Sequence, residues 1–166
     1  MGMRKKTALT FTAGMLATLV MAFPPEASAQ GDNIYLANLK GVQEKVVALA
    51  EAIPADKYSW RPADGVRSVS EALMHIAAAH YFFARSFGVE APADVRDWEK
   101  TVTTKADVIT KLKASFDAIT GALAKADMSQ QSSLNAAMGA ISHGHEHMGQ
   151  MIAYARSNGV VPPWSR

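Results

Sequence analysis

All five histidines of this chain fall in two short stretches, and their spacing suits the binding of a metal ion. His143 and His147 are four residues apart, so on a helix they lie about 40° apart on one face and both imidazoles can reach the same ion. His145 points about 160° away from both and cannot join them. Two histidines on one helix and a third on a facing helix would give three nitrogen ligands. Such a set leaves a position open to water or substrate, as in catalytic zinc sites.

The third ligand must be His75 or His80, which lie about 140° apart on a helix, so that only one of them faces a given site. The spacing H-x-x-x-H alone leaves two interpretations open, a metal site and a set of histidines that lie on the surface or are hydrogen-bonded in the core. His145 lies in line with an apolar stripe that fits a core or a subunit interface better than a metal site. The stripe consists of Leu134, Met138, Ile141, Met148 and Ile152.

Two polar residues near these histidines are candidates for a supporting role. Gln150 lies close in direction to the H-x-x-x-H pair, so its amide is placed to orient a ligand or a bound water, although an ordinary polar contact would also explain it. Glu71 lies one turn before His75 and could accept a proton from a metal-bound water. However, Ser68 and Glu71 also have the spacing of a capping box, in which each side chain bonds an otherwise unpaired backbone N–H at a helix start. We favour this structural role.

The elements that must position these side chains are helices. Apolar residues recur every three or four positions in four segments, and no segment shows the alternation typical of a strand. The segments are expected at about 33–51, from Ser68, from Thr104, and at about 129–157. Four amphipathic helices predict an all-α fold of the four-helix-bundle type, and the two longer connections leave the order of the helices around the bundle open.

The first 29 residues have the pattern of a cleavable signal peptide. A basic start, MGMRKK, precedes an apolar segment at 8–23 and then Ala27-Ser28-Ala29, an A-x-A cleavage site. The apolar segment is shorter than the roughly 20 residues of a spanning helix, which argues against a retained membrane anchor. We therefore expect residues 1–29 to be removed, residues 30–166 to form one domain, and the mature protein to be periplasmic or secreted, without a stable membrane anchor.

Charge and composition make several functions improbable. Without the signal peptide the chain has equal numbers of acidic and basic side chains, so its net charge gives no reason to expect nucleic-acid binding. The chain has no cysteine, which excludes disulfides, thiolate metal sites and a cysteine nucleophile. A metal ion must therefore rely mainly on His, Asp or Glu.

Two motifs of this sequence resemble those of the DinB-like family (DinB/YfiT-like metalloenzymes). They are SVSEALMH at 68–75 and HGHEHMGQ at 143–150. In that family a four-helix bundle carries one metal-binding histidine on its second helix and an H-x-x-x-H-x-G-Q signature on its last. The resemblance covers nearly all of the expected mature chain. It implies a homodimer that holds zinc, nickel or iron, with His75, His143 and His147 as the ligands.

The resemblance does not fix the reaction, because members include thiol-dependent transferases and isomerases, proposed metal hydrolases and proteins without known activity. Three neutral imidazoles would lower the pKa of a bound water from about 15.7 toward about 7. We expect an exported metal-binding protein that acts on a small-molecule substrate as a metal-dependent hydrolase or transferase. No catalytic residue besides the metal ligands can be named. The alternatives are a non-catalytic metal-binding or stress-related bundle protein, and a bundle whose histidines hold no ion.

Overall fold

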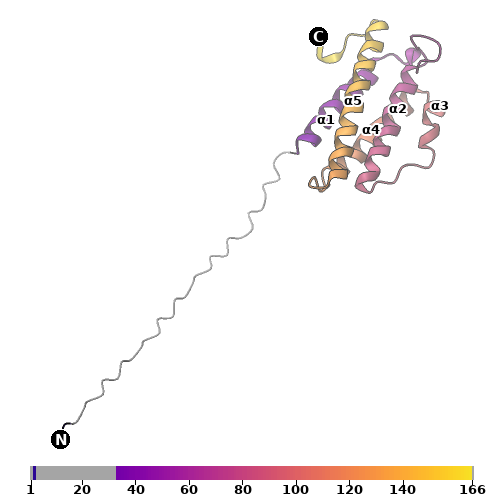
Figure 1. Ribbon diagram of the computed structural model, residues 1–166. Coiled ribbons are helices and arrows are strands. Elements are labelled where there is room, and N and C mark those ends of the chain that lie inside the picture. Colours follow the sequence, from indigo (N-terminus) through magenta and orange to yellow (C-terminus); the bar gives the residue numbers. More distant parts are fainter. Residues whose placement is uncertain (1, 3–32, 166) are drawn as a thin grey trace. The chain divides into compact units, whose positions relative to one another are not determined.

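The computed structural model describes residue 2 and residues 33–165. The predicted signal peptide, its cleavage site and the domain boundary at residues 29 and 30 lie outside this part of the chain. Within it the fold is all-helical, with five α-helices and no strand (Figure 1). No helix of residues 33–165 combines the length and the apolar character that crossing a bilayer requires. The predicted all-α class is confirmed.

Four of the five helices are long and correspond to the four predicted segments. Three of them begin directly after a residue whose side-chain oxygen accepts a hydrogen bond from the first turn, namely Asn33, Ser68 and Thr104. Such caps satisfy backbone N–H groups that have no partner inside the helix. The helix bounds are α1 Ile34–Ala52, α2 Val69–Ala84, α3 Trp98–Thr101, α4 Lys105–Leu123 and α5 Gln131–Ser157.

The capping box predicted at the start of α2 is present. Ser68 Oγ accepts a hydrogen bond from the Glu71 backbone N–H at 3.3 Å, and Glu71 Oε2 accepts one from the Ser68 N–H at 2.9 Å. The guanidinium of Arg61 donates to the other carboxylate oxygen at 2.8 Å. The start of α2, and with it the direction of the helix toward His75, is therefore fixed by three hydrogen bonds.

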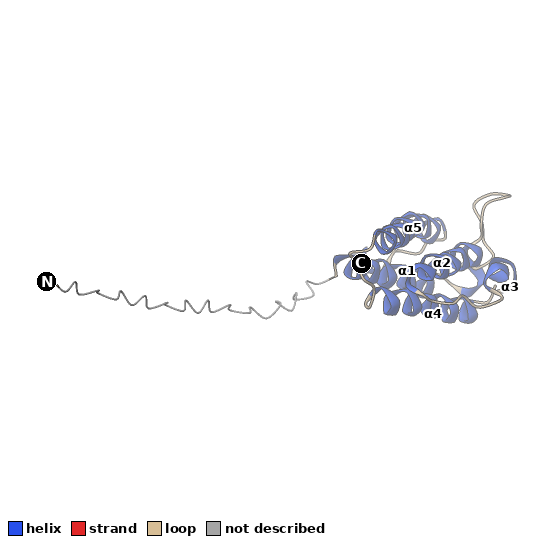
Figure 2. Ribbon diagram, turned by 60° about the horizontal axis from the view of Figure 1, so that its bottom comes forward, coloured by secondary structure: helices blue, strands red, loops and turns tan. Residues whose placement is uncertain are grey.

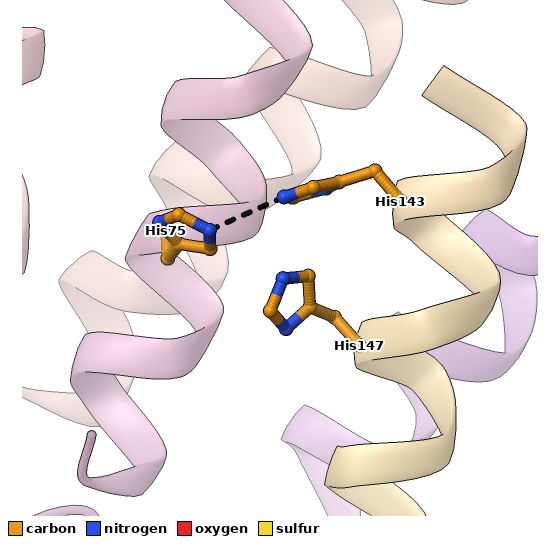
Figure 3. A group of neighbouring side chains, drawn as sticks. All are labelled: His75, His143 and His147. Carbon is orange, nitrogen blue, oxygen red and sulfur yellow. Dashed lines mark hydrogen bonds between the residues drawn. The ribbon is translucent and has the colours of Figure 1, made fainter. Parts of the chain in front are cut away.

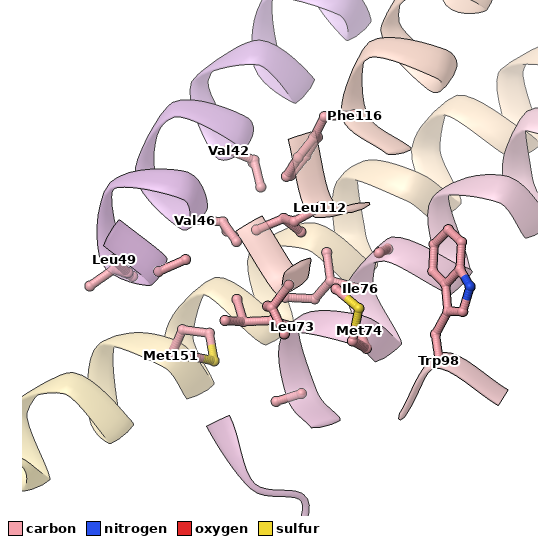
Figure 4. Packing of buried hydrophobic residues seen from close by; sticks show 14 of the residues in the cluster. Val42, Val46, Leu49, Leu73, Met74, Ile76, Trp98, Leu112, Phe116 and Met151 are labelled. Atoms are coloured by element: carbon pink, nitrogen blue, oxygen red, sulfur yellow. The ribbon is translucent and has the colours of Figure 1, made fainter. Parts of the chain in front are cut away.

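The order of the long helices, which the sequence leaves open, follows from their packing. Both α1 and α2 pack against α4 and against α5, so the order around the bundle is α1, α4, α2, α5. Figure 2 shows α1 and α2 between α5 on one side and α4 on the other. Apolar side chains from all four helices meet in one core (Figure 4), which includes Val42, Val46, Leu49, Leu73, Ile76, Leu112, Phe116 and Met151.

The second longer connection, between α2 and α4, contains α3, a helix that the apolar periodicity of the sequence does not predict. This four-residue helix packs against α2. Trp98 is only 2% exposed, and its ring lies nearly perpendicular to the Tyr81 ring, 5.8 Å between centroids. Lys111 Nζ lies 4.2 Å from the Trp98 ring centroid. Burial of an indole of this size fixes the connection against the side of the bundle.

Candidate metal centre

The three histidines predicted as ligands come together between α2 and α5. The side chains of His75, His143 and His147 point into the same space (Figure 3). One possible ligand nitrogen from each lies within 4.8 Å of the other two. His147 is buried and the other two are half-buried. The fold thus brings His75 to within hydrogen-bond distance of His143, which lies 68 positions further along the chain.

The spacing of the nitrogens is compatible with a shared ion. His75 Nε2 lies 3.2 Å from His143 Nε2. Two nitrogens that each lie about 2.1 Å from one zinc ion, at a tetrahedral angle, are about 3.4 Å apart. The full group spreads over up to 4.8 Å, so an ion would draw the rings together slightly. Imidazole is a ligand for zinc, nickel and iron alike, so the donor set fits a divalent ion without selecting one of them.

A carboxylate outside the group holds His75. His75 Nδ1 lies 2.9 Å from Glu99 Oε1, and the other Glu99 oxygen accepts a hydrogen bond from Arg67 Nε at 2.7 Å. Burial raises the pKa of Glu99, but the hydrogen bonds from Arg67 and His75 outweigh it and keep this pKa below its usual value. Glu99 is therefore an ionised acceptor, and it directs His75 Nε2 toward the other two histidines.

Sequence reasoning missed Glu99. It lies in α3, a helix of one turn that is too short for its apolar periodicity to be recognised, and it is 24 positions from His75. The periodicity of a helix relates residues of the same helix, so it does not connect Glu99 on α3 with His75 on α2. Only the docking of α3 on α2 brings them together.

An amide holds His147 in the same manner. Gln150 Oε1 lies 2.7 Å from His147 Nδ1, so the contact proposed for Gln150 is present. Gln150 Nε2 donates to Tyr154 Oη at 2.9 Å, and this hydroxyl donates to the backbone oxygen of Arg67 at 2.9 Å. Donors and acceptors alternate along this series of hydrogen bonds when His147 carries its proton on Nδ1. His147 Nε2 is then free to bind an ion.

His143, the remaining histidine of the group, is uncharged at neutral pH. Burial lowers the pKa of His143 to about 4, and the neighbouring His147, His75 and Arg67 act in the same direction. A neutral imidazole has a lone pair available, whereas an imidazolium would have to lose a proton before it could bind a metal ion.

His80 and His145 lie outside the group. His80 is 1% exposed, and its Nδ1 lies 2.9 Å from Ser115 Oγ, in the packing between α2 and α4. Burial lowers the pKa of His80 to about 3, with a smaller contribution from His143. His145 is exposed, and its Nε2 lies 2.9 Å from Asn38 Oδ1 on α1. His80 is a core histidine and His145 a surface histidine.

Glu71, the other candidate for a supporting role, is occupied at the helix start. Burial raises its pKa, while hydrogen bonds from the Ser68 backbone and from Arg61 lower it, and the net result is a lowered pKa. Since each of its oxygens already accepts a hydrogen bond, the structure favours the cap over the proton acceptor.

Close approach of α5 to its neighbours depends on two glycines. A Cβ at Gly144 would lie 2.9 Å from Val42 Cγ1 on α1, and a Cβ at Gly139 would lie 2.6 Å from Cε1 of Phe83 on α2. The Phe83 ring in turn lies 6.0 Å from the His143 ring, measured between centroids. Small residues at these positions let α5 pack close enough for its histidines to meet His75.

A helical bundle with three converging histidines between two of its helices defines a class of candidate metal-binding proteins. Within that class, a family model described as the DinB superfamily matches residues 38–153, a range that contains all three histidines. The chain belongs to the DinB superfamily. Neither a curated protein nor a solved structure matches it.

Proposed function

We propose that this protein binds one divalent metal ion through His75, His143 and His147 and hydrolyses a small-molecule substrate at that ion. The convergence of the three imidazoles, with ligand nitrogens within 4.8 Å of one another, is the observation that carries the proposal. Three protein ligands leave at least one coordination position for water or substrate. When bound, such an ion lowers the pKa of a coordinated water to about 7.

The residues around the histidines support this proposal by preparing them for an ion. Glu99 and Gln150 each contact an Nδ1 atom, of His75 and His147 respectively, which places the lone pair of each imidazole on Nε2. Such outer hydrogen bonds fix the tautomer and the ring orientation of metal ligands. We prefer hydrolysis to thiol-dependent transfer because the predicted export would separate the protein from cytosolic thiols.

Metal content provides the first test. The purified mature protein should contain about one zinc, nickel or iron ion per chain, and His75→Ala, His143→Ala and His147→Ala should each lose it. His145→Ala is the matched control, because it removes an exposed histidine of the same helix and should retain the ion. A wild-type protein that neither contains an ion nor binds added zinc, nickel or iron would refute the metal site.

Hydrolysis is tested with activated carboxylic and phosphoric esters. The metal-loaded protein should cleave at least one class, with a rate that rises through about pH 7 as the coordinated water ionises, and a chelator should abolish the activity. A metal-loaded protein that cleaves none of these esters and unfolds when the ion is removed would instead favour the non-catalytic alternative.

We also propose that the protein is exported and forms a homodimer. Export rests on the basic start, the apolar segment and the A-x-A site of residues 1–29. The homodimer rests on the family resemblance, and the exposed side chains of Phe82 on α2 and Met138 on α5 suit burial by a second copy. Cell fractionation with N-terminal sequencing tests the first, and light scattering of the purified mature protein tests the second.

A further inference from the structure

We infer that Glu99 is a positioning residue of the proposed metal site, and that docking of α3 against α2 is thereby coupled to metal binding. The inference rests on the proposed function, since it assigns a role toward the same ion. It concerns a residue of the second connection, outside the two helices that carry the ligands. Glu99 belongs to α3, whereas the histidines belong to α2 and α5.

The hydrogen bond between Glu99 and His75 selects one tautomer of the imidazole. An ionised carboxylate can only accept, so the 2.9 Å contact requires the proton of His75 to be on Nδ1. His75 Nε2 then carries the lone pair. Its 3.2 Å contact with His143 Nε2 agrees with this, because in the metal-free protein the His143 Nε2–H can donate to that lone pair. This proton must leave His143 Nε2 before the same nitrogen can bind an ion. The His75 nitrogen that faces the site is therefore the one able to bind an ion.

The carboxylate itself is held in place from two directions. Arg67 donates to Glu99 Oε2 from Nε at 2.7 Å, and its Nη2 lies 3.5 Å from Oε1. Trp98, the preceding residue, is 2% exposed and anchors α3 against α2 through its contact with Tyr81. Because Arg67 and Trp98 hold the carboxylate independently of His75, Glu99 can orient His75 without being part of the same helix.

Arg67 joins this contact to the hydrogen bonds behind His147. Its side chain binds Glu99, and its backbone oxygen accepts the hydrogen bond of Tyr154, which supports Gln150. The two supported histidines differ, however, since His75 is backed by a carboxylate and His147 by a neutral amide. A carboxylate raises the basicity of the imidazole more, so loss of Glu99 should weaken metal binding clearly.

The experiment compares Glu99→Ala, Glu99→Gln and the control Asp97→Ala. Asp97 has the same charge, is exposed and lies two residues away, and its side chain does not cap α3. The first measurement is the His75 tautomer in the metal-free proteins, read from two-bond ¹H–¹⁵N correlations of ¹⁵N-histidine-labelled samples. The second is zinc and nickel affinity by competition with a chromophoric chelator. Circular dichroism confirms that each variant is folded.

The wild type and Asp97→Ala should both have His75 protonated on Nδ1 and should have equal affinities. Glu99→Ala should give a mixture of tautomers and bind metal about 10- to 100-fold more weakly. Glu99→Gln has one accepting oxygen for two donors, Arg67 Nε–H and His75 Nδ1–H. It should therefore hold the Nδ1 tautomer less completely than the wild type and have an intermediate affinity. An unchanged tautomer and unchanged affinity in Glu99→Ala would overturn the inference, and so would equal losses in Asp97→Ala.

The two measurements separate this inference from the proposed function. If the wild type binds no metal, the proposed function fails, while the tautomer in the metal-free protein still tests the contact between Glu99 and His75. If the wild type binds metal and Glu99→Ala does so equally well with the same tautomer, the metal site stands and the role of Glu99 is refuted. Should Glu99→Ala fail to fold, Glu99→Gln decides through its affinity relative to Asp97→Ala.

Discussion

At the scale of single residues, the five histidines differ in role because their surroundings differ. His80 and His75 are on the same helix, yet His80 lies in the core beside Ser115 and Phe116 while His75 faces α5. Ser115 Oγ donates to the Leu112 backbone oxygen at 2.7 Å, so it accepts the hydrogen bond from His80 Nδ1. A neutral His80 fits this arrangement, and an imidazolium would add a buried charge.

The burial of His80 predicts acid sensitivity. Its pKa is lowered from 6.5 to about 3 in the folded protein, so below pH 6.5 the unfolded chain binds a proton that the folded chain does not. The free energy of unfolding therefore decreases as the pH falls from about 6.5 toward about 3. Between about pH 7.5 and about pH 5 this one residue should account for about 2 kcal/mol.

Urea unfolding of the metal-free protein at these two pH values measures the effect. His80→Leu should reduce the loss of stability between them by about that amount, whereas His145→Ala should leave it unchanged because His145 is exposed. If His80→Leu and the wild type lose equal stability on acidification, His80 is not the acid-sensitive group.

At the scale of secondary-structure elements, the sequence predicts features set within one helix and misses those set between elements. The spacing of His143 and His147 predicts that they share a face, because the geometry of one helix determines it. The choice of His75 over His80 needed the family resemblance. Glu99 could not be predicted at all, since its role depends on where a one-turn helix docks.

Close contact between α1 and α5 at Gly144 leads to a second prediction. The side chain of Gly144→Val would collide with Val42, whose Cγ1 is 2.9 Å from the position of the first added carbon. Overpacking of this kind costs about 1–3 kcal/mol. Gly149→Val is the matched control on the same helix, because a Cβ there meets nothing within 4 Å.

Chemical unfolding of the two valine variants measures this difference. Gly149→Val should be nearly neutral, since valine and glycine differ little in helix propensity compared with the cost of overpacking. Equal stabilities of Gly144→Val and Gly149→Val would show that α1 and α5 can separate at this point without cost.

At the scale of the whole molecule, an ion at the three histidines would connect α2 with α5, two helices that are far apart in the sequence. It would bind the folded protein and not the unfolded chain, so it should raise the free energy of unfolding by about 2.7 kcal/mol when its free concentration is 100 times the dissociation constant. For a domain of this size, that corresponds to a rise in Tm of several degrees.

Thermal unfolding with and without added zinc or nickel tests this prediction. The wild type should show the rise and a chelator should reverse it, while His143→Ala should show neither. A wild type whose Tm does not respond to either ion, under conditions in which it binds one, would mean that the ion does not distinguish the folded from the unfolded state.

The order of the helices along the chain also bears on when an ion could bind. His75 lies on α2, but its two partner ligands lie on α5, the last long helix of the chain. A partly synthesised or partly folded chain therefore has only one of the three ligands in place. If the protein binds an ion as proposed, binding would follow the docking of α5, and the ion would come from the compartment in which α5 docks.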